Sequence, residues 1–259
     1  MRRNNRGQHI LIEKNIFQNI IELLPTKYSE IIEIGPGPGN LTELLCKTGR
    51  PVIAIEIDKK YKKRLDNLPY PNLSIIYEDV LRLLKNNRFP SKENSIIAGN
   101  LPYYITKEIF RWLFSYSVKW YQAILMVQKE VALRLMAKPG NRDYGILTIF
   151  REIFAAGKMI KIIKPQAFRP QPRVDSAIIW LEKREKPLIE EKNIKKFSYF
   201  IKTAFAERRK IILNNLVKIA NKDEVLKILE KNDIDILKRP ENLTITQYVR
   251  LFDEFINYL

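Results

Sequence analysis

The segment Asn100-Leu101-Pro102-Tyr103 carries groups that can hold a flat nitrogen base whose exocyclic amine is to be alkylated. The Asn100 amide oxygen and the Leu101 carbonyl oxygen can each accept a hydrogen bond from that amine. Pro102 stiffens the turn, and Tyr103 offers an aromatic face on which a base can stack. The apolar run 96–99 precedes the segment, as expected at the carboxyl end of a buried parallel strand, where ligands bind in open α/β sheets. Taken alone, the segment fits an ordinary strand-ending turn equally well.

A glycine-rich turn, 35–39, joins the predicted strand 31–34 to the start of a helix, as in the first unit of a nucleotide-binding α/β fold. The next predicted strand, 52–55, ends at Glu56, about twenty residues after the turn begins, where the acid that binds a ribose hydroxyl belongs. The dinucleotide fingerprint requires Gly-x-Gly-x-x-Gly, and Asn40 stands where its last glycine would fall. S-adenosylmethionine has no pyrophosphate to bind, so the pattern favours it over a nicotinamide dinucleotide.

Glu78 and Asp79 follow the third predicted strand, 73–77. A carboxylate at this strand end could accept a hydrogen bond from the amino group of an adenine ring. Asp79 could equally cap the helix that begins at Val80, because aspartate is a preferred N-cap residue. Both interpretations are open at this point.

The chain has 259 residues and a formal net charge of +17, so a polyanionic partner is expected. Nucleic acid fits better than a merely solvated basic surface, because acidic residues do not rise in step with the basic ones. An anionic membrane is less favoured, since no basic stretch accompanies a strongly apolar helical face. The basic clusters are Arg2, Arg3 and Arg6; Lys59, Lys60, Lys62, Lys63 and Arg64; Lys161, Lys164, Arg169 and Arg173; and Arg208, Arg209 and Lys210.

Residue counts and hydropathy exclude several kinds of protein. Cys46 is the only cysteine and His9 the only histidine, so neither an intrachain disulfide nor a Cys/His zinc site is expected, and we expect no metal. Cys46 is interpreted as a core residue. No stretch approaches the roughly 18 to 20 uninterrupted apolar residues of a membrane span, and the amino-terminal residues lack the apolar region of a secretion signal. We therefore expect a cytoplasmic monomer without membrane contact.

Predicted strands and helices alternate through the first part of the chain, which is typical of an α/β fold with a doubly wound, Rossmann-like parallel sheet. The charged stretch 182–186 and Pro187 then mark a linker. The helices predicted after this linker are 193–216, 223–230 and 246–255. We expect an α/β domain over residues 1–182 and a small all-helical domain over 190–259.

Two prolines, Pro170 and Pro172, interrupt the pattern in the segment 168–176. Each proline fixes its own backbone and restricts the residue before it, so an extended loop is predicted. This loop would place Phe168 on a fixed, exposed backbone.

Seven motifs, in this order, resemble those of the ribosomal RNA adenine N6,N6-dimethyltransferase family of the KsgA type, over nearly the whole chain. They are Gly7-Gln8-His9-Ile10-Leu11, Glu33-Ile34-Gly35-Pro36-Gly37, Asn100-Leu101-Pro102-Tyr103-Tyr104-Ile105-Thr106, Val127-Gln128-Lys129-Glu130-Val131-Ala132 with Arg134-Leu135, Phe168-x-Pro170-x-Pro172-x-Val174-x-Ser176, Ala204-Phe205-x-x-Arg208-Arg209-Lys210 and Arg239-Pro240-Glu241-Asn242-Leu243. One departure is His9-Ile10, where many bacterial members have Asn-Phe. His-Ile is more similar to eukaryotic and archaeal members, so the branch stays open.

The resemblance implies S-adenosylmethionine as the cofactor and small-subunit rRNA, within an immature ribosomal particle, as the partner. The S-adenosylmethionine site would be lined by His9, Leu11, Gly35, Glu56, Asp79 and Asn100. Within it, Glu56 would hold the ribose hydroxyls and Asp79 the adenine amine.

By the same resemblance, the target adenosine is flipped out and stacked between Tyr103 and Phe168. Its amine would donate hydrogen bonds to Asn100 and Leu101. The implied reaction is methyl transfer to N6 of two adjacent adenosines near the 3′ end of small-subunit rRNA during ribosome biogenesis. The helical C-terminal domain would contact the RNA.

Two alternatives remain. An Erm-type enzyme shares the catalytic motifs but modifies large-subunit rRNA, although 127–130, 143–145 and 204–210 are more similar to the KsgA type. A non-catalytic RNA-binding assembly or transcription factor on the same fold is the second alternative, and the intact segment 100–103 argues against it.

Overall fold

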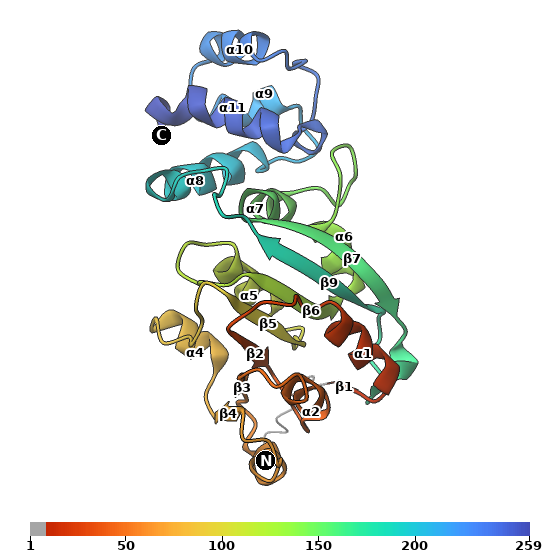
Figure 1. Cartoon of the computed structure of the whole chain (residues 1–259). Coiled ribbons are helices and arrows are strands. Elements are labelled where there is room, and N and C mark those ends of the chain that lie inside the picture. Colours follow the sequence, from red (N-terminus) through yellow and green to blue (C-terminus); the bar gives the residue numbers. More distant parts are fainter. Residues whose placement is uncertain (1–8) are drawn as a thin grey trace, which may run out of the picture. The chain divides into compact units, whose positions relative to one another are not determined.

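The computed structural model describes residues 9–259 (Figure 1), and its contacts divide the chain into two compact units. The sheet unit comprises the chain up to Ala132 together with Gly157–Lys183, and the helical unit comprises Leu133–Ala156 and Arg184–Leu259. The predicted domain bounds, 1–182 and 190–259, stay a prediction. The stretch 133–156 belongs to the helical unit.

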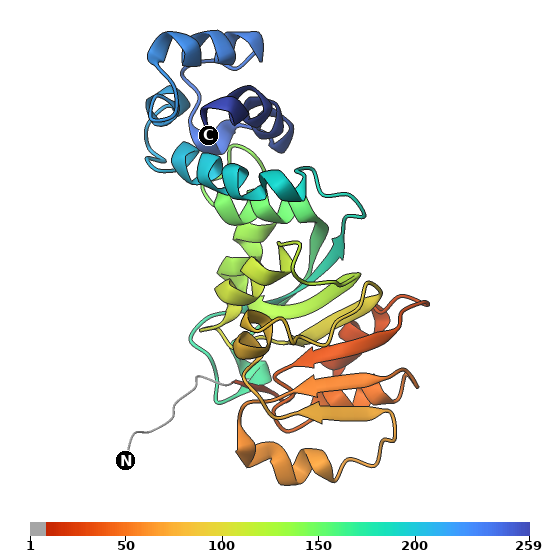
Figure 2. The ribbon, with the colours of Figure 1, turned by 90° about the vertical axis from the view of Figure 1, so that its left-hand side faces the viewer.

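The sheet unit is built on a sheet with the strand order β4-β3-β2-β5-β6-β9-β7 (Figure 2). Its strands are β2 (Glu30–Ile34), β3 (Val52–Ile55), β4 (Leu73–Ile76), β5 (Ser95–Asn100), β6 (Gln122–Gln128), β7 (Ala155–Ile163) and β9 (Ser176–Lys183). The neighbours from β4 to β6 are parallel, which confirms the predicted Rossmann-like sheet. β9 runs antiparallel to β6. The chain reaches β9 from β7 through residues 164–175, which hold a 3-10 turn and a short strand.

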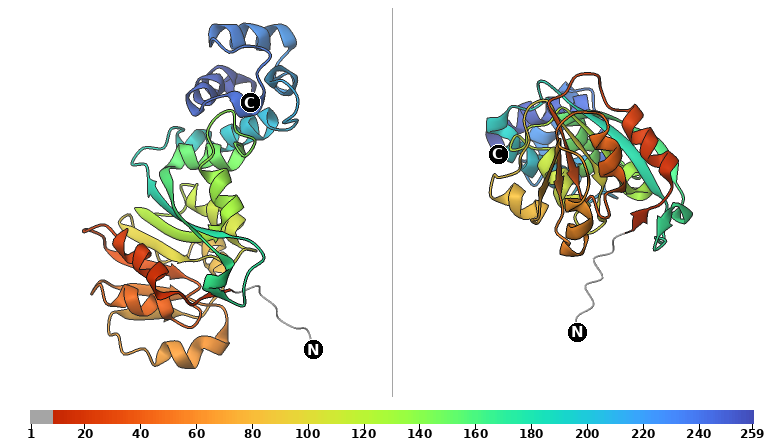
Figure 3. Two further views of the ribbon diagram at one scale, coloured as in Figure 1. Left: turned by 90° about the vertical axis from the view of Figure 1, so that its right-hand side faces the viewer. Right: turned by 60° about the horizontal axis from the view of Figure 1, so that its bottom comes forward.

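Helices cover both faces of this sheet (Figure 3): α1 (Lys14–Glu22) and α2 (Asn40–Cys46) lie on one face, and α4 (Val80–Lys85) and α5 (Thr106–Leu113) lie on the other. The remaining helices that begin in the sheet unit are α3 (Lys62–Asp66) and α6 (Lys129–Leu135). Because both faces are covered, β2 is buried along its whole length and β5 and β6 are buried up to their last residues. Cys46 is buried, which confirms its interpretation as a core residue.

Gly99 lets β5 approach β2 closely. Its φ is +151°, a value that side chains rarely allow, and a Cβ atom there would overlap the carbonyl oxygen of Ile34. Since Ile34 is the last residue of β2, this contact brings the carboxyl ends of the two strands together.

A small second sheet pairs β1 (Ile10–Leu11) with β8 (Phe168–Arg169) in the antiparallel direction. The prediction that the prolines leave Phe168 exposed is wrong, because its side chain is only 1% exposed and packs in the hydrophobic core. Phe168 lies opposite Leu11, which is also buried. Strand β1, which is far from Phe168 in the sequence, therefore pairs with the segment that the local sequence assigns to a loop.

The helical unit contains α7 (Ile146–Phe154), α8 (Ile194–Ala204), α9 (Ile212–Leu216), α10 (Lys222–Lys231) and α11 (Ile245–Phe255). Its core is aromatic: Phe197 of α8 lies edge-on to Phe252 of α11, with ring centroids 5.2 Å apart. The prediction of one helix over 193–216 is wrong, because α8 ends at Ala204 and α9 begins at Ile212.

A buried side chain holds the turn between α8 and α9. Asn215 accepts a hydrogen bond from the N–H of Glu207 at 3.0 Å and donates one to the Glu207 carbonyl oxygen at 3.2 Å. The next residue, Arg208, donates to the carbonyl oxygens of Arg142 and Tyr144, both at 2.7 Å. The side chain of Asn215 thus satisfies the N–H and the carbonyl oxygen of Glu207, two backbone groups that a continuous helix would pair with other backbone groups along the chain.

Substituting alanine for Gly99 should destabilise the protein much more than substituting alanine for Gly49. Both glycines have positive φ, so each change costs on the order of 1–2 kcal/mol in backbone strain. No described atom lies within 4 Å of a Cβ at Gly49, whereas the overlap at Gly99 adds about 1–3 kcal/mol or more. Urea denaturation measures both losses. Equal losses would contradict the close approach of the two strands.

Candidate active site

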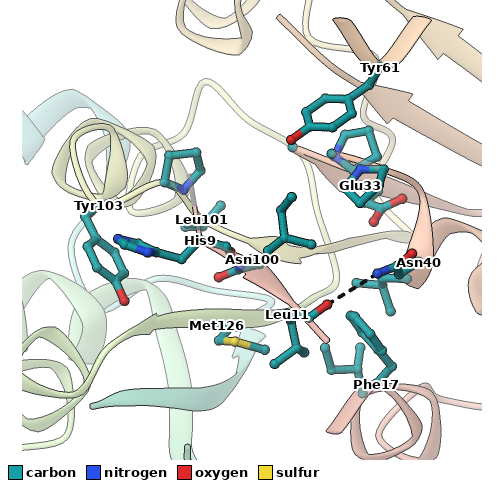
Figure 4. A pocket seen from close by; sticks show the side chains of 18 residues that line it. His9, Leu11, Phe17, Glu33, Asn40, Tyr61, Asn100, Leu101, Tyr103 and Met126 are labelled. Atoms are coloured by element: carbon teal, nitrogen blue, oxygen red, sulfur yellow. Dashed lines mark hydrogen bonds between the residues drawn. The ribbon is translucent and has the colours of Figure 1, made fainter. Parts of the chain in front are cut away.

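The carboxyl ends of β2 and β5 open onto a cavity in the sheet unit (Figure 4). The strands are parallel neighbours with Glu33 opposite Ala98, so the glycine-rich turn and the Asn100 segment meet at one edge of the sheet. The predicted site residues that line the cavity are His9, Leu11, Gly35, Asn100, Leu101 and Tyr103. Lining residues for which no role was predicted include Phe17, Glu33, Asn40, Tyr61 and Met126.

Asn100 is oriented by the amino-terminal segment. Its Nδ2 atom donates a hydrogen bond to the carbonyl oxygen of His9 at 2.9 Å. The acceptor atom of the amide, Oδ1, takes no part in that bond. The neighbouring Leu101 is buried, and its N–H donates to the carbonyl oxygen of Met126 at 3.0 Å, so the backbone that follows Asn100 is fixed to β6.

Tyr103 is held at two points. Its hydroxyl lies 3.1 Å from Oγ of Ser176, and its ring centroid lies 5.5 Å from that of His9 at an interplanar angle of 36°. Burial raises the pKa of Tyr103, although the Ser176 hydroxyl lowers it, so the phenol stays protonated at neutral pH. Phe168 is not among the described residues that line the cavity, and its stacking on a base stays a prediction.

Glu56 directly follows β3 as predicted, whereas β4 ends at Ile76, three residues before Asp79. Neither acid is among the described lining residues. The buried Glu56 carboxylate accepts hydrogen bonds from the N–H groups of Gly37, at 3.0 Å, and Asp58, at 2.7 Å. Burial raises the pKa of Glu56, and these backbone bonds lower it. Asp79 accepts from the N–H of Leu81 at 2.9 Å, which confirms the N-cap interpretation. The ribose and adenine contacts of the two acids stay predictions.

Glu33 is a lining residue to which sequence analysis assigned no role. Although its side chain is only 1% exposed, it lines the cavity. The pKa of the Glu33 carboxyl is raised from 4.5 to about 8. Burial is the main cause and the Glu56 carboxylate adds to it, while the hydrogen bond from Oγ1 of Thr42 at 2.6 Å acts in the opposite direction. The available signal was an acid inside an apolar strand immediately before the glycine-rich turn. Because both faces of the sheet are covered, an acid inside such a strand is buried whichever face its side chain points to.

Asn40 ties the start of α2 to the amino-terminal wall of the cavity. Its Nδ2 atom donates to the carbonyl oxygen of Leu11 at 3.3 Å, and its Oδ1 atom accepts from Nη2 of Arg64 at 3.1 Å. The residue that marks a missing glycine in the dinucleotide fingerprint therefore has a structural role of its own.

Some residues of the predicted basic clusters are paired with acids, as Lys164 is with Asp175 at 3.2 Å. Arg169 and Arg173, on either side of the first proline of their segment, are exposed. The predicted residues Arg2, Arg3, Arg6, Gly7 and Gln8 lie outside the described residues.

Two kinds of feature do not occur in residues 9–259. None of the helices there is long and apolar enough to cross a membrane. In the same range, no group of three or more His, Cys, Asp or Glu side chains is placed to hold a metal ion.

The fold and the cavity define a class of protein. A mostly parallel sheet, a glycine-rich turn after β2, an acid after β3 and the Asn100 segment after β5 are the features of a Rossmann-like methyltransferase. The sequence model of the ribosomal RNA adenine dimethylase family matches residues 1–257, and the chain belongs to this family.

Two relatives share the same name, ribosomal RNA small subunit methyltransferase A. The protein from Geobacillus sp. (strain WCH70) is 37% identical over 257 residues, which cover 95% of this chain and 88% of that protein. The protein from Mycoplasma mobile is 35% identical over 249 residues, which cover 96% of each chain.

Two solved structures are similar along most of the chain. A dimethyladenosine transferase from Plasmodium falciparum has a TM-score of 0.80 and 28% identity, over 96% of this chain and 98% of that one. The 23S rRNA methyltransferase ErmE has a TM-score of 0.73 and 24% identity, over 95% of this chain and 99% of that one, which shows a shared fold.

Replacing Glu33 by glutamine should remove a pH-dependent loss of stability. The unfolded carboxyl has an ordinary pKa of 4.5 and the folded one a pKa of about 8, so between these values only the folded state keeps the proton, and stability falls as pH rises. In this window the Glu33 carboxyl alone lowers the free energy of unfolding by about 1.4 kcal/mol for each unit that the pH rises. Glu33→Gln should therefore gain stability relative to the wild type as pH rises through this window.

Urea denaturation at a series of pH values across that window measures this difference. Glu22→Gln, on α1, is the matched control for loss of a carboxylate. A difference between Glu33→Gln and the wild type that stays constant with pH would contradict the raised pKa of Glu33.

Proposed function

We propose that this protein transfers methyl groups from S-adenosylmethionine to N6 of two adjacent adenosines near the 3′ end of small-subunit rRNA, giving N6,N6-dimethyladenosines during ribosome biogenesis. The observation that carries the proposal is the orientation of Asn100 in the cavity. Its Nδ2 atom is bonded to His9, which leaves Oδ1 to accept a hydrogen bond from a base amine beside Tyr103. Membership of the dimethylase family and the names of the relatives support the same substrate.

S-adenosylmethionine would supply an electrophilic methyl group on a sulfonium cation. The residues proposed to hold it are Leu11, Gly35, Glu56, Asp79 and Asn100, and the family resemblance implies a contact with His9 as well. The cavity fits a cation, because none of its described lining residues is a lysine or an arginine and because a bound cation would favour the ionised form of the Glu33 carboxyl. The neighbouring Glu56 carboxylate adds to this preference for positive charge.

The chain's own groups would prepare the target amine. Oδ1 of Asn100 and the carbonyl oxygen of Leu101 would accept the two amine hydrogens. Two acceptors draw the amine toward a pyramidal geometry, which makes its lone pair available for in-line attack on the methyl group. Tyr103, fixed through Ser176, would support one face of the base. Phe168 would have to leave the core before it could stack on the other face.

The two alternatives have less support. The likeness to ErmE concerns the fold alone, while the relatives that are more than one third identical are named for the small subunit. The intact segment 100–103, set on the cavity with its amide oriented, disfavours a protein that binds RNA without catalysis.

The proposed RNA substrate lies within an immature ribosomal particle, which the protein would meet in the cytoplasm as a monomer. The net charge of +17 supports a polyanionic substrate. The helical unit is proposed to contact the RNA. In the sheet unit, Arg169 lies exposed on β8, whose partner strand β1 contributes to the wall of the cavity.

Replacing Asn100 by alanine should lower the rate of methyl transfer by about 100-fold or more, because an acceptor that acts in the transition state is lost. The rate is measured with labelled S-adenosylmethionine and unmethylated small-subunit particles. Asn67→Ala is the matched control. It removes an exposed amide that bonds only locally, to the carbonyl oxygen of Lys63 at 2.7 Å, and should leave the rate unchanged. An Asn100→Ala variant with the wild-type rate would contradict the assignment.

Replacing both Arg169 and Arg173 by alanine should weaken RNA binding and lower the slope of log affinity against log salt by about 2. Lys47→Ala with Lys85→Ala makes the same charge change at exposed positions and should leave the slope nearer the wild-type value. Fluorescence anisotropy with labelled RNA measures both double variants between about 50 and 200 mM salt. A nearly flat salt dependence of the wild type would contradict the role of basic surface residues.

A further inference from the structure

His9 contacts Pro170, Tyr103 and Asn100, of which the last two line the cavity. Its Nδ1 atom lies 2.7 Å from the carbonyl oxygen of Pro170, and its ring lies against Tyr103 with centroids 5.5 Å apart. Its own carbonyl oxygen accepts the hydrogen bond from Nδ2 of Asn100. Figure 4 shows His9 beside both Tyr103 and Asn100. One residue therefore links the segment after β8 to both polar side chains of the reactive segment.

The pairing of β1 with β8 explains why the His9 carbonyl is available. The N–H of Ile12 donates to the carbonyl oxygen of Ala167 at 2.9 Å, so these two residues form a hydrogen-bonded pair of the ladder. Hydrogen-bonded and non-hydrogen-bonded pairs alternate, and the register places His9 opposite Pro170 in a non-hydrogen-bonded pair. The backbone carbonyl of such a residue points away from the ladder. Proline is tolerated there because no N–H is needed.

The bond to Pro170 fixes the tautomer of the imidazole. A carbonyl oxygen only accepts, so Nδ1 must carry the hydrogen. In the neutral ring Nε2 then holds the lone pair. Because the Nδ1–H group is present in both the neutral and the protonated ring, this bond survives a change of charge.

We propose that His9 is a positioning residue for methyl transfer. The bond from Nδ1 to Pro170 holds the ring against Tyr103, and the carbonyl of the same residue sets the orientation of the Asn100 amide. This inference rests on the proposed function and differs from the cofactor-binding role that the family resemblance implies. A positioning residue changes the turnover step, whereas a cofactor ligand changes cofactor affinity.

Two variants separate these roles. His9→Ala removes the donor and the ring and should lower kcat about 10-fold to 100-fold, because a small misplacement of reacting groups is costly. The dissociation constant of the unreactive product S-adenosylhomocysteine, measured by calorimetry, should change less than about threefold, which is under 0.7 kcal/mol. His9→Asn keeps a donor close to the position of Nδ1 and should recover part of the lost kcat.

The two measurements on His9→Ala, kcat and the affinity for S-adenosylhomocysteine, decide whether the inference holds. A wild-type kcat in His9→Ala overturns the inference, as does a loss of S-adenosylhomocysteine affinity with kcat retained. If the wild-type protein itself transfers no methyl group, the proposed function fails instead. A thermal melt of each variant shows whether it is folded.

A second measurement needs no variant and no activity. Because His9 is the only histidine, a long-range proton–nitrogen NMR spectrum of the wild-type protein shows a single imidazole. The bond to Pro170 predicts that, in the neutral ring, Nδ1 carries the proton. A neutral ring protonated at Nε2 would overturn the inference whatever the variants do.

Discussion

The close approach of β5 to β2 is the constraint on which the site depends. Gly99 has no Cβ atom, so the backbone of β5 can lie against the carbonyl of Ile34 at the end of β2. The glycine-rich turn that leaves β2 and the Asn100 segment that leaves β5 therefore open onto the same cavity. The other elements act on this junction. β6 fixes the backbone through Met126, and β1, which is paired with β8, provides a further wall.

Polar groups at this junction are buried, and each is stabilised by a specific partner. Glu56 is satisfied by two backbone N–H groups, and the Glu33 carboxyl by the hydroxyl of Thr42. Burial still disfavours their charged forms, which raises the pKa of both acids. Of the two, only Glu33 is among the described lining residues of the cavity, and a positively charged ligand there would favour the ionised form of its carboxyl. This links the electrostatics of the cavity to the sulfonium cofactor we propose.

Local signals in the sequence predicted the strands β2, β3, β4 and β5 and the glycine-rich turn, and they gave the helix cap at Asp79 as one of two interpretations. They failed where distant residues decide the structure. Phe168 is buried because β1, far away in the sequence, pairs with β8, and the helix predicted through 205–211 is interrupted by the side chain of Asn215. The pKa of Glu33 likewise depends on burial between elements, which no local pattern reports. Periodicity predicts elements, but it does not tell which of their surfaces become covered.

The central claim is the identity of the substrate. Labelled S-adenosylmethionine should be offered in parallel to unmethylated small-subunit particles and to naked large-subunit RNA, with the modified nucleosides identified by mass spectrometry. We expect N6,N6-dimethyladenosine at two adjacent positions near the 3′ end of the small-subunit RNA, and no label in the large-subunit RNA. Label in the large-subunit RNA, or none in either substrate despite tight RNA binding, would contradict it.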